Sequence, residues 1–155
     1  MRLFFYLPIS ILLLVITSCS LNSEQETSLN QHLTKFLRAK NECMLVGVVG
    51  FTYPEYIKEL KEQGDSTFLS KIDCTNSQLE NSFFYSDPTL RKIEKQKDEI
   101  HVFYELKVDD KMGEKVGLKK GLYAISKDNG QKWYFLMEEV YKDSKSCPKL
   151  KRLIN

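Results

Sequence analysis

The stretch IHVFYELKV, residues 100–108, decides the fold class, because polar and apolar side chains alternate along it. Ile100 and Val102 would lie on one face, and His101 and Glu105 on the other. Successive side chains of a β-strand point to opposite faces, so this period of two predicts a strand with one face on a core and the other partly in water.

Shorter strand patterns flank this segment. Residues 81–86 and 90–95 precede it, with Asp87-Pro88 between them, and residues 115–126 follow it. We expect these segments to add neighbouring strands to the same sheet.

A hairpin is predicted at the C-terminal end of the sheet. A last strand runs from Gln131 to about Glu138, directly after the dipeptide Asn129-Gly130. A two-residue type I′ turn needs positive φ at both central positions, which Asn and Gly tolerate. We therefore expect residues 123–137 to form a β-hairpin with a two-residue turn.

The first half of the chain has helical periodicity instead. Residues 23–26 fit a capping box, and apolar residues then recur every three or four positions to about Lys40. Residues 41–50 suit either a second helix or a buried strand, and Pro54 is well placed to begin a helix that ends at Gly64. Helices followed by an antiparallel meander predict an α+β domain, with the helices packed on one face of the sheet.

The N-terminus has the pattern of an export signal. One basic residue, Arg2, precedes an apolar run from Leu3 to Ile16. This run is too short to cross a bilayer as a helix, which needs roughly 20 apolar residues. A charged start followed by a short apolar segment predicts a signal peptide over residues 1–18.

The signal ends in Ile16-Thr17-Ser18-Cys19, which resembles the lipobox of bacterial lipoproteins. The resemblance implies cleavage before Cys19 and acyl chains, such as palmitate, on that residue, which would hold the protein on a membrane. Ser20 stands where, in that family, an aspartate would favour the inner membrane. We therefore expect an outer-membrane or cell-surface location.

Composition limits the remaining chain to a small, nearly neutral domain. Removing 18 of the 155 residues leaves 137, with 22 basic side chains (23 less Arg2) against 21 acidic ones. Such a length fits one domain, and the charge balance gives no basic surface for nucleic acid. We expect a lipidated tether over residues 19–27, an α+β domain over residues 28–140 and a polar tail over residues 141–155, which could include a short helix.

Three cysteines besides Cys19 would lie in a compartment that permits disulfides. Cys43 with Cys74 is the favoured pair, and this bridge would contribute roughly 3 to 4 kcal/mol by the chain-entropy estimate. A bridge from Cys74 to Cys147 and three reduced, buried thiols are the alternatives.

Residues 126–133 match the Asp-box pattern S-x-D-x-G-x-x-W, which occurs on hairpins of sialidase-like propellers. A single copy in a chain this short cannot supply the repeated blades of a propeller. The pattern predicts instead that Asp128 accepts hydrogen bonds from backbone amides of the turn and that Trp133 packs across the hairpin.

No arrangement of residues identifies a catalytic or metal centre. His101 and Glu105 share a strand face and could serve as acid and base, although solvated side chains are the expected outcome. His32 and His101 have no cysteine, aspartate or second histidine at metal-ligand spacing, so no metal site or cofactor is predicted.

Aromatic residues are the candidates for a ligand pocket. Apart from those in the signal, most must fill the core, and some could line a cleft between helices and sheet. The candidates are Tyr53, Tyr56, Phe103 and Trp133.

The order of elements, with Tyr53-Pro54 opening a helix and DNGQKW at residues 128–133 in the last hairpin, resembles a group of bacterial envelope proteins. These proteins have a nuclear-transport-factor-like, or cystatin-like, cone fold. The resemblance covers roughly residues 26–140. It implies a cone-shaped α+β domain, but it assigns no acid or base here. A single Gly64 stands where the relatives often have two glycines.

These features predict a membrane-anchored, non-catalytic domain that binds an envelope protein or a small apolar ligand. Two alternatives stay open. One is an isomerase or dehydratase in which His101, Glu105 or a tyrosine carries the proton. The other is an immunity protein that neutralises a toxin through an acidic or apolar patch.

Overall fold

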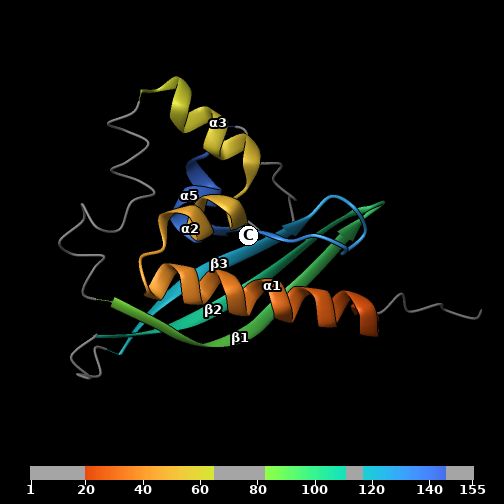
Figure 1. Ribbon diagram of the computed structural model, residues 1–155. Coiled ribbons are helices and arrows are strands. Elements are labelled where there is room, and N and C mark those ends of the chain that lie inside the picture. The colour runs from red at the N-terminus through yellow and green to blue at the C-terminus, as the bar shows by residue number, and fades with distance from the viewer. Residues whose placement is uncertain (1–19, 65–82, 111–116, 146–155) are drawn as a thin grey trace, which may run out of the picture.

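The computed structural model describes residues 20–64, 83–110 and 117–145 (Figure 1). Three helices come first, followed by four strands and a short last helix. Their bounds are α1 Ser23–Asn41, α2 Leu45–Phe51, α3 Pro54–Glu62, β1 Phe83–Gln96, β2 Glu99–Asp110, β3 Leu118–Ser126, β4 Tyr134–Met137 and α5 Glu138–Asp143. The predicted α+β class is therefore confirmed.

The four strands form one antiparallel meander in the order β1-β2-β3-β4. The expected break at Asp87-Pro88 is absent, because β1 is a single strand with an irregularity between Ser86 and Thr89. Asp87 has a φ of 47° there. Proline lacks an N–H group and is tolerated at an edge strand, so β1 continues past it.

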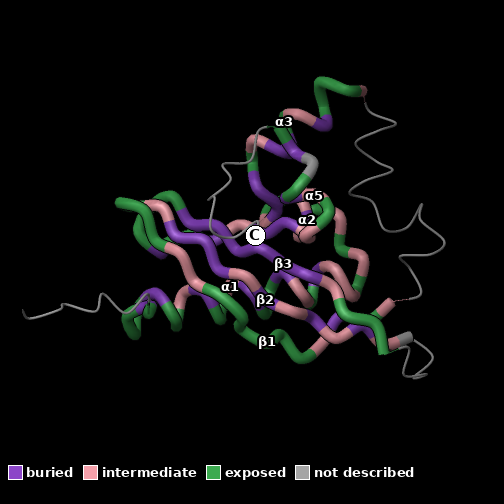
Figure 2. The backbone as a smooth tube through the Cα atoms, turned by 180° about the vertical axis from the view of Figure 1, so that it is seen from behind, coloured by how far each residue is buried: buried purple, intermediate pink, exposed green. Residues whose placement is uncertain are grey.

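Period-two alternation divides the core between the two faces of the sheet. Val102, Tyr104 and Leu106 of β2 pack with α1 on one side, which we call the α1 face. The opposite side, the α5 face, carries Phe103 of β2 and Tyr123 of β3 against α3 and α5. Helices thus cover both faces, whereas the sequence predicted them on one. In Figure 2 the buried residues run through the middle of the sheet and the exposed ones along β1.

The connection between α2 and α3 carries the chain from one face to the other. It passes the β4 edge of the sheet, where Thr52 forms a parallel bridge with Phe135. Residues 45–51 are helical, which settles the choice between helix and strand left open by their valines and glycines. Pro54 begins α3 as predicted.

The folded part of the chain begins earlier than residue 28. Asn22 caps α1, accepting a hydrogen bond from the Gln25 backbone N–H, while the Gln25 side chain accepts from the Asn22 N–H. The capping box therefore lies one residue before the predicted one, and α1 occupies most of the expected tether. Leu21 is also buried in the core of the α1 face.

The predicted β3–β4 hairpin is confirmed, with Tyr123 opposite Leu136. Asn129 and Gly130 both have positive φ, as expected. The turn is nevertheless longer than two residues, because strand pairing stops at Ile125 and Tyr134. Hydrogen bonds to side chains replace the missing strand pairs in this connection.

The last strand ends at Met137, and α5 follows without a gap. The sequence placed residue 138 in a strand and residues 141–155 in a polar tail. Instead Tyr141 and Ser144 are buried, and the Ser144 hydroxyl donates to a Glu59 carboxylate oxygen at 2.9 Å. The folded domain therefore extends at least to Ser144.

Cys43, between α1 and α2, forms a disulfide. Its partner lies outside the described residues. The alternative of three reduced thiols therefore does not hold, and the Cys43–Cys74 pairing stays a prediction.

Candidate functional site

His101 is a titratable side chain in the interior of the α5 face, and it is fully buried. The expectation of a solvated histidine is therefore wrong. Alternation along β2 correctly placed His101 on the face away from Val102, but α5 covers that part of the face. The covering residue is Tyr141, whose ring meets the imidazole edge-on at 5.9 Å between centroids.

Both ring nitrogens of His101 have hydrogen-bond partners. Nε2 lies 2.8 Å from Oε1 of Glu99, and Nδ1 lies 3.0 Å from the hydroxyl of Tyr141. A carboxylate only accepts, so Nε2 carries the proton of the neutral ring and Nδ1 accepts from the tyrosine. Burial lowers the pKa of His101, outweighing the attraction of Glu99. A substrate in solvent has no path to either nitrogen, because the whole side chain is covered.

Glu105 lies on the same face of β2, as predicted, but in a different setting. Its carboxylate is 2.7 Å from Arg91 of β1 and 2.8 Å from Lys119 of β3. These two cations lower the pKa of Glu105, so it is a poor proton acceptor at neutral pH. His101 and Glu105 are engaged with separate partners and form no acid–base pair.

Buried tyrosines are the other proton carriers that the sequence suggested. Burial raises the pKa of Tyr104 and of Tyr123 to about 12, so both remain protonated at neutral pH. Tyr123 also stacks on Tyr141, with ring centroids 3.7 Å apart and planes at 11°. The aromatic rings of the α5 face therefore pack against one another.

Gly121 of β3 lets α5 lie close to the sheet. A Cβ at this position would be 2.3 Å from Oε2 and 2.7 Å from Cβ of Glu138, and 2.8 Å from a ring carbon of Phe103. Sequence reasoning missed both Gly121 and Tyr141. The only signals were a glycine inside a strand pattern and an aromatic residue at the start of an apparent polar tail.

The four aromatic pocket candidates do not lie together. Tyr53 and Tyr56 belong to the core of the α5 face, and Phe103 packs against it, whereas Trp133 lies in the core of the α1 face. Tyr53 and Trp133 are fully buried. Only Tyr56 borders a small apolar cavity, of about 40 Å³, between α1, α2 and β4. That volume holds water but not a ligand, since ligand pockets measure roughly 300–1,000 Å³.

Two larger depressions lie beside α3, and one of them, of about 340 Å³, is lined by both apolar and polar residues, among them Tyr56, Leu60 and Glu139. The other, of about 570 Å³, lies along α3 and is lined by Glu55, Lys58, Glu59, Glu62, Gln63 and Lys145. Charged side chains of both signs suit neither an apolar ligand nor a defined catalytic role.

The β3–β4 connection has the hydrogen bonds expected for its Asp-box pattern. Oδ1 of Asp128 accepts from the backbone N–H groups of Gln131 and Lys132 at 3.1 and 2.9 Å. The indole N–H of Trp133 donates to the Gly130 carbonyl at 3.0 Å. Burial raises the pKa of Asp128, but the bonds that it accepts from Lys132, the Ser126 hydroxyl and Gln131 outweigh burial and lower it. The predicted hydrogen bonds of Asp128 are confirmed, and Trp133 is buried in the core of the α1 face.

Within residues 20–64, 83–110 and 117–145, no three histidine, cysteine, aspartate or glutamate side chains are grouped to hold a metal ion. None of the helices in these ranges has the length and apolar content needed to span a bilayer.

No known protein-family model matches the chain, and comparisons with curated proteins and with solved structures gave no match. The cone shape and the likeness to nuclear-transport-factor-like proteins therefore stay predictions.

Proposed function

We propose that this chain is a lipid-anchored, non-catalytic domain of the cell envelope that binds a protein partner. The observation that carries the binding role is a group of exposed apolar side chains at one end of the domain. The anchor follows from the lipobox ending at Cys19, and the partner surface lies at the opposite end of the domain from Ser20, the residue that follows it in the sequence.

The exposed residues are Met44, Val46, Phe84 and Leu118, which we call the apolar end. Their exposed fractions are 49%, 87%, 45% and 47%. Isolated exposed apolar residues are ordinary, but several at one end of a small domain favour a protein contact.

Backbone pairing and one side chain bring these residues to the same end. Asn41, in the last turn of α1, donates to the Tyr85 carbonyl and accepts from the Tyr85 N–H, both at 2.9 Å. Tyr85 is paired through Val108 with Leu118. The α1–α2 corner, the start of β1 and the start of β3 therefore adjoin, with Leu118 on the α1 face of the sheet and Phe84 on the opposite face.

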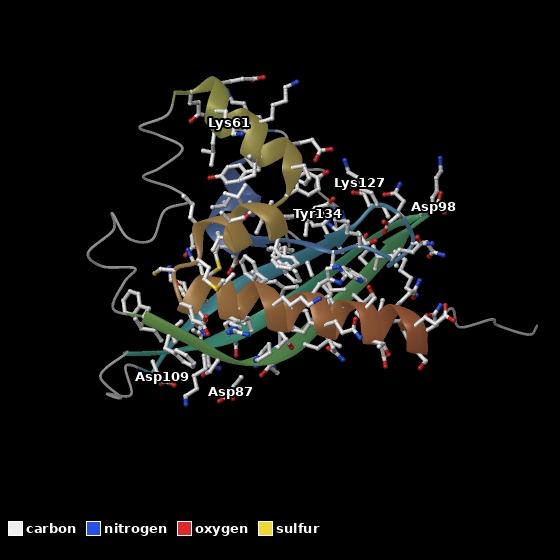
Figure 3. All side chains as sticks on the ribbon, in the orientation of Figure 1. Lys61, Asp87, Asp98, Asp109, Lys127 and Tyr134 are labelled. Atoms are coloured by element: carbon white, nitrogen blue, oxygen red, sulfur yellow. The ribbon has the colours of Figure 1, made fainter. Side chains whose placement is uncertain are left out.

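Charged residues border the apolar end. Figure 3 places Asp87 and Asp109 there, and Lys107 lies 3.2 Å from Asp109. Apolar residues surrounded by charged ones are typical of protein interfaces. The cavity of about 40 Å³ beside Tyr56 is too small for a ligand, and the exposed apolar end favours a protein as the partner.

The enzyme alternative has less support. His101 is covered on all sides, Glu105 is paired with two cations, and the two do not meet. An immunity protein would be a special case of the proposed function, in which the partner is a toxin.

The test compares the proteins recovered with variants of the apolar end from detergent-solubilised envelopes. Val46→Asp and Phe84→Ser are each expected to weaken binding of the partner by about 2 kcal/mol, which is roughly 30-fold in Kd. At this affinity the partner should no longer be recovered. Leu90→Ser is the matched control, since Leu90 is 49% exposed but lies further along β1. Urea unfolding checks that all three variants remain folded.

A partner that is kept by Leu90→Ser and lost by both other variants would support the proposal. The same set of proteins recovered with all variants, or no protein recovered with the wild type under several growth conditions, would contradict it.

A further inference from the structure

The chain is held in the folded domain from Ser20 onward. The Ser20 carbonyl accepts a hydrogen bond from the Lys95 ammonium, Leu21 is only 8% exposed, and Asn22 caps α1. Lys95 belongs to β1, so the first described residues are tied to the sheet as well as to the helix.

This attachment leaves no free linker on the domain side of Cys19. Adjacent Cα atoms lie 3.8 Å apart across a trans peptide bond, so the lipid-bearing residue is within one peptide unit of Ser20. We propose that the end of the domain around Ser20 lies against the lipid headgroups, so that the domain has a fixed orientation on the bilayer. This inference depends on the proposed lipid anchor.

Three segments form this end, which we call the anchor end: the start of α1, the β1–β2 turn and the β3–β4 connection. Gln25 Nε2 donates to the Asn129 carbonyl at 2.9 Å, and the Asn129 N–H donates to the Asp98 carbonyl at 2.9 Å. Gly130 also packs on Gln25, whose Cγ would be 2.6 Å from an added Cβ. The anchor end is therefore a connected surface (Figure 1).

The side chains exposed at the anchor end suit headgroups rather than the hydrocarbon core. They include both cations and anions, namely Lys97, Lys127, Lys132, Asp98 and Asp128. None of the large apolar side chains exposed in the described parts of the chain lies there. The domain would therefore rest on the polar surface without inserting.

The orientation places the apolar end away from the membrane. The 19 residues of α1 run from Ser23 at the anchor end to Asn41 near Tyr85. At 1.5 Å per residue this separates the two ends by about 28 Å. A fixed orientation would thus present the apolar end to partners outside the bilayer.

The experiment measures the distance of each end from the headgroups in the mature, lipid-modified protein. The protein is isotopically labelled and placed in nanodiscs, and gadolinium chelates on lipid headgroups reduce the NMR signals of nearby amides. We expect a loss of signal for the Lys97 and Asn129 amides and none for those of Met44 and Phe84. Equal losses at both ends, or a larger loss at the apolar end, would overturn the inference.

A linker variant is the matched control. Inserting a flexible segment of about ten Gly and Ser residues between Cys19 and Ser20 keeps the anchor but frees the domain. The difference between the two ends should then shrink while the protein stays in the nanodisc. An undiminished difference would overturn the proposed cause, which is the short attachment.

Mass spectrometry of the mature N-terminus separates this inference from the proposed function. An unmodified Cys19, or a Cys19→Ser variant that stays in the membrane fraction, would overturn both. Acylated Cys19 with equal signal losses at the two ends would overturn the fixed orientation alone.

Discussion

Gly121 of β3 lies against Glu138, the first residue of α5. Its missing side chain leaves room for Glu138 and Phe103, neither of which could keep its place beside a Cβ. Because Gly121 has no Cβ, α5 can pack against this part of the α5 face. Gly50 in α2 differs, because an added Cβ there would meet nothing within 4 Å.

Gly121→Ala should lower the free energy of unfolding by about 1–3 kcal/mol, because the methyl group overpacks the contact between β3 and α5. Gly50→Ala is the matched control and should be neutral or stabilising by up to about 1 kcal/mol. Urea unfolding followed by circular dichroism measures both variants. A Gly121→Ala protein as stable as the wild type would contradict the packing described for α5.

His101 makes the stability of the domain depend on pH. Burial holds its pKa below the ordinary value of 6.5, although Glu99 and Glu94 favour the charged form, and Lys127 acts with burial. The unfolded chain therefore binds a proton at higher pH than the folded one. The stability due to neutral His101 is complete above about pH 6.5 and is lost as the pH falls through the range below it.

We expect the free energy of unfolding to fall between about pH 7 and about pH 5, before the carboxylates titrate. His101→Gln retains a hydrogen-bonding side chain without a titratable ring, so its curve should be flatter over this range. Unfolding in urea at a series of pH values gives both curves. Parallel curves for the two proteins would rule out His101 as the source of the dependence.

At the scale of elements, α5 has only six residues and depends on its contacts with the sheet and α3. A helix this short does not form by itself in water. Tyr141 supplies two of its contacts, the stack on Tyr123 and the hydrogen bond to His101. The Ser144 hydroxyl adds a third by bonding to Glu59 of α3.

Tyr141→Phe should cost about 1–3 kcal/mol, because the ring still stacks but Nδ1 of His101 loses its buried partner. Tyr141→Ala should cost about 3–5 kcal/mol, since the stack is lost too. Lys142→Ala is the control, because Lys142 follows Tyr141 in α5 but its side chain is exposed. This variant should change the free energy of unfolding by less than about 0.5 kcal/mol. Chemical unfolding distinguishes these values, and a Tyr141→Phe protein with wild-type stability would refute the role of the hydroxyl.

At the scale of the whole molecule, the two ends of the domain differ in chemistry. The anchor end is polar and closed by hydrogen bonds among Gln25, Asn129 and Asp98, and it follows Cys19 directly. The apolar end lies about one α1 length away. The proposed function and the proposed orientation agree with each other, because the anchor end would lie on the membrane and the apolar end would bind the partner.

The local elements follow from the sequence because they depend on neighbouring residues. Alternation over residues 100–108 predicted β2, the dipeptide Asn129-Gly130 predicted the hairpin, and Pro54 predicted the start of α3. The strand at Asp87-Pro88 and the helix after Met137 were missed, because sheet pairing and packing on distant residues override these local signals.

The tertiary structure alone decided what covers each face of the sheet. A period of two says that His101 and Val102 point to opposite sides, but not that α5 would bury the histidine. It also cannot show that Tyr53 and Trp133 belong to separate cores. Both outcomes depend on contacts between segments that are far apart in the sequence, as His101 and Tyr141 are 40 residues apart. Whether a residue is buried depends on such contacts and not on its type alone.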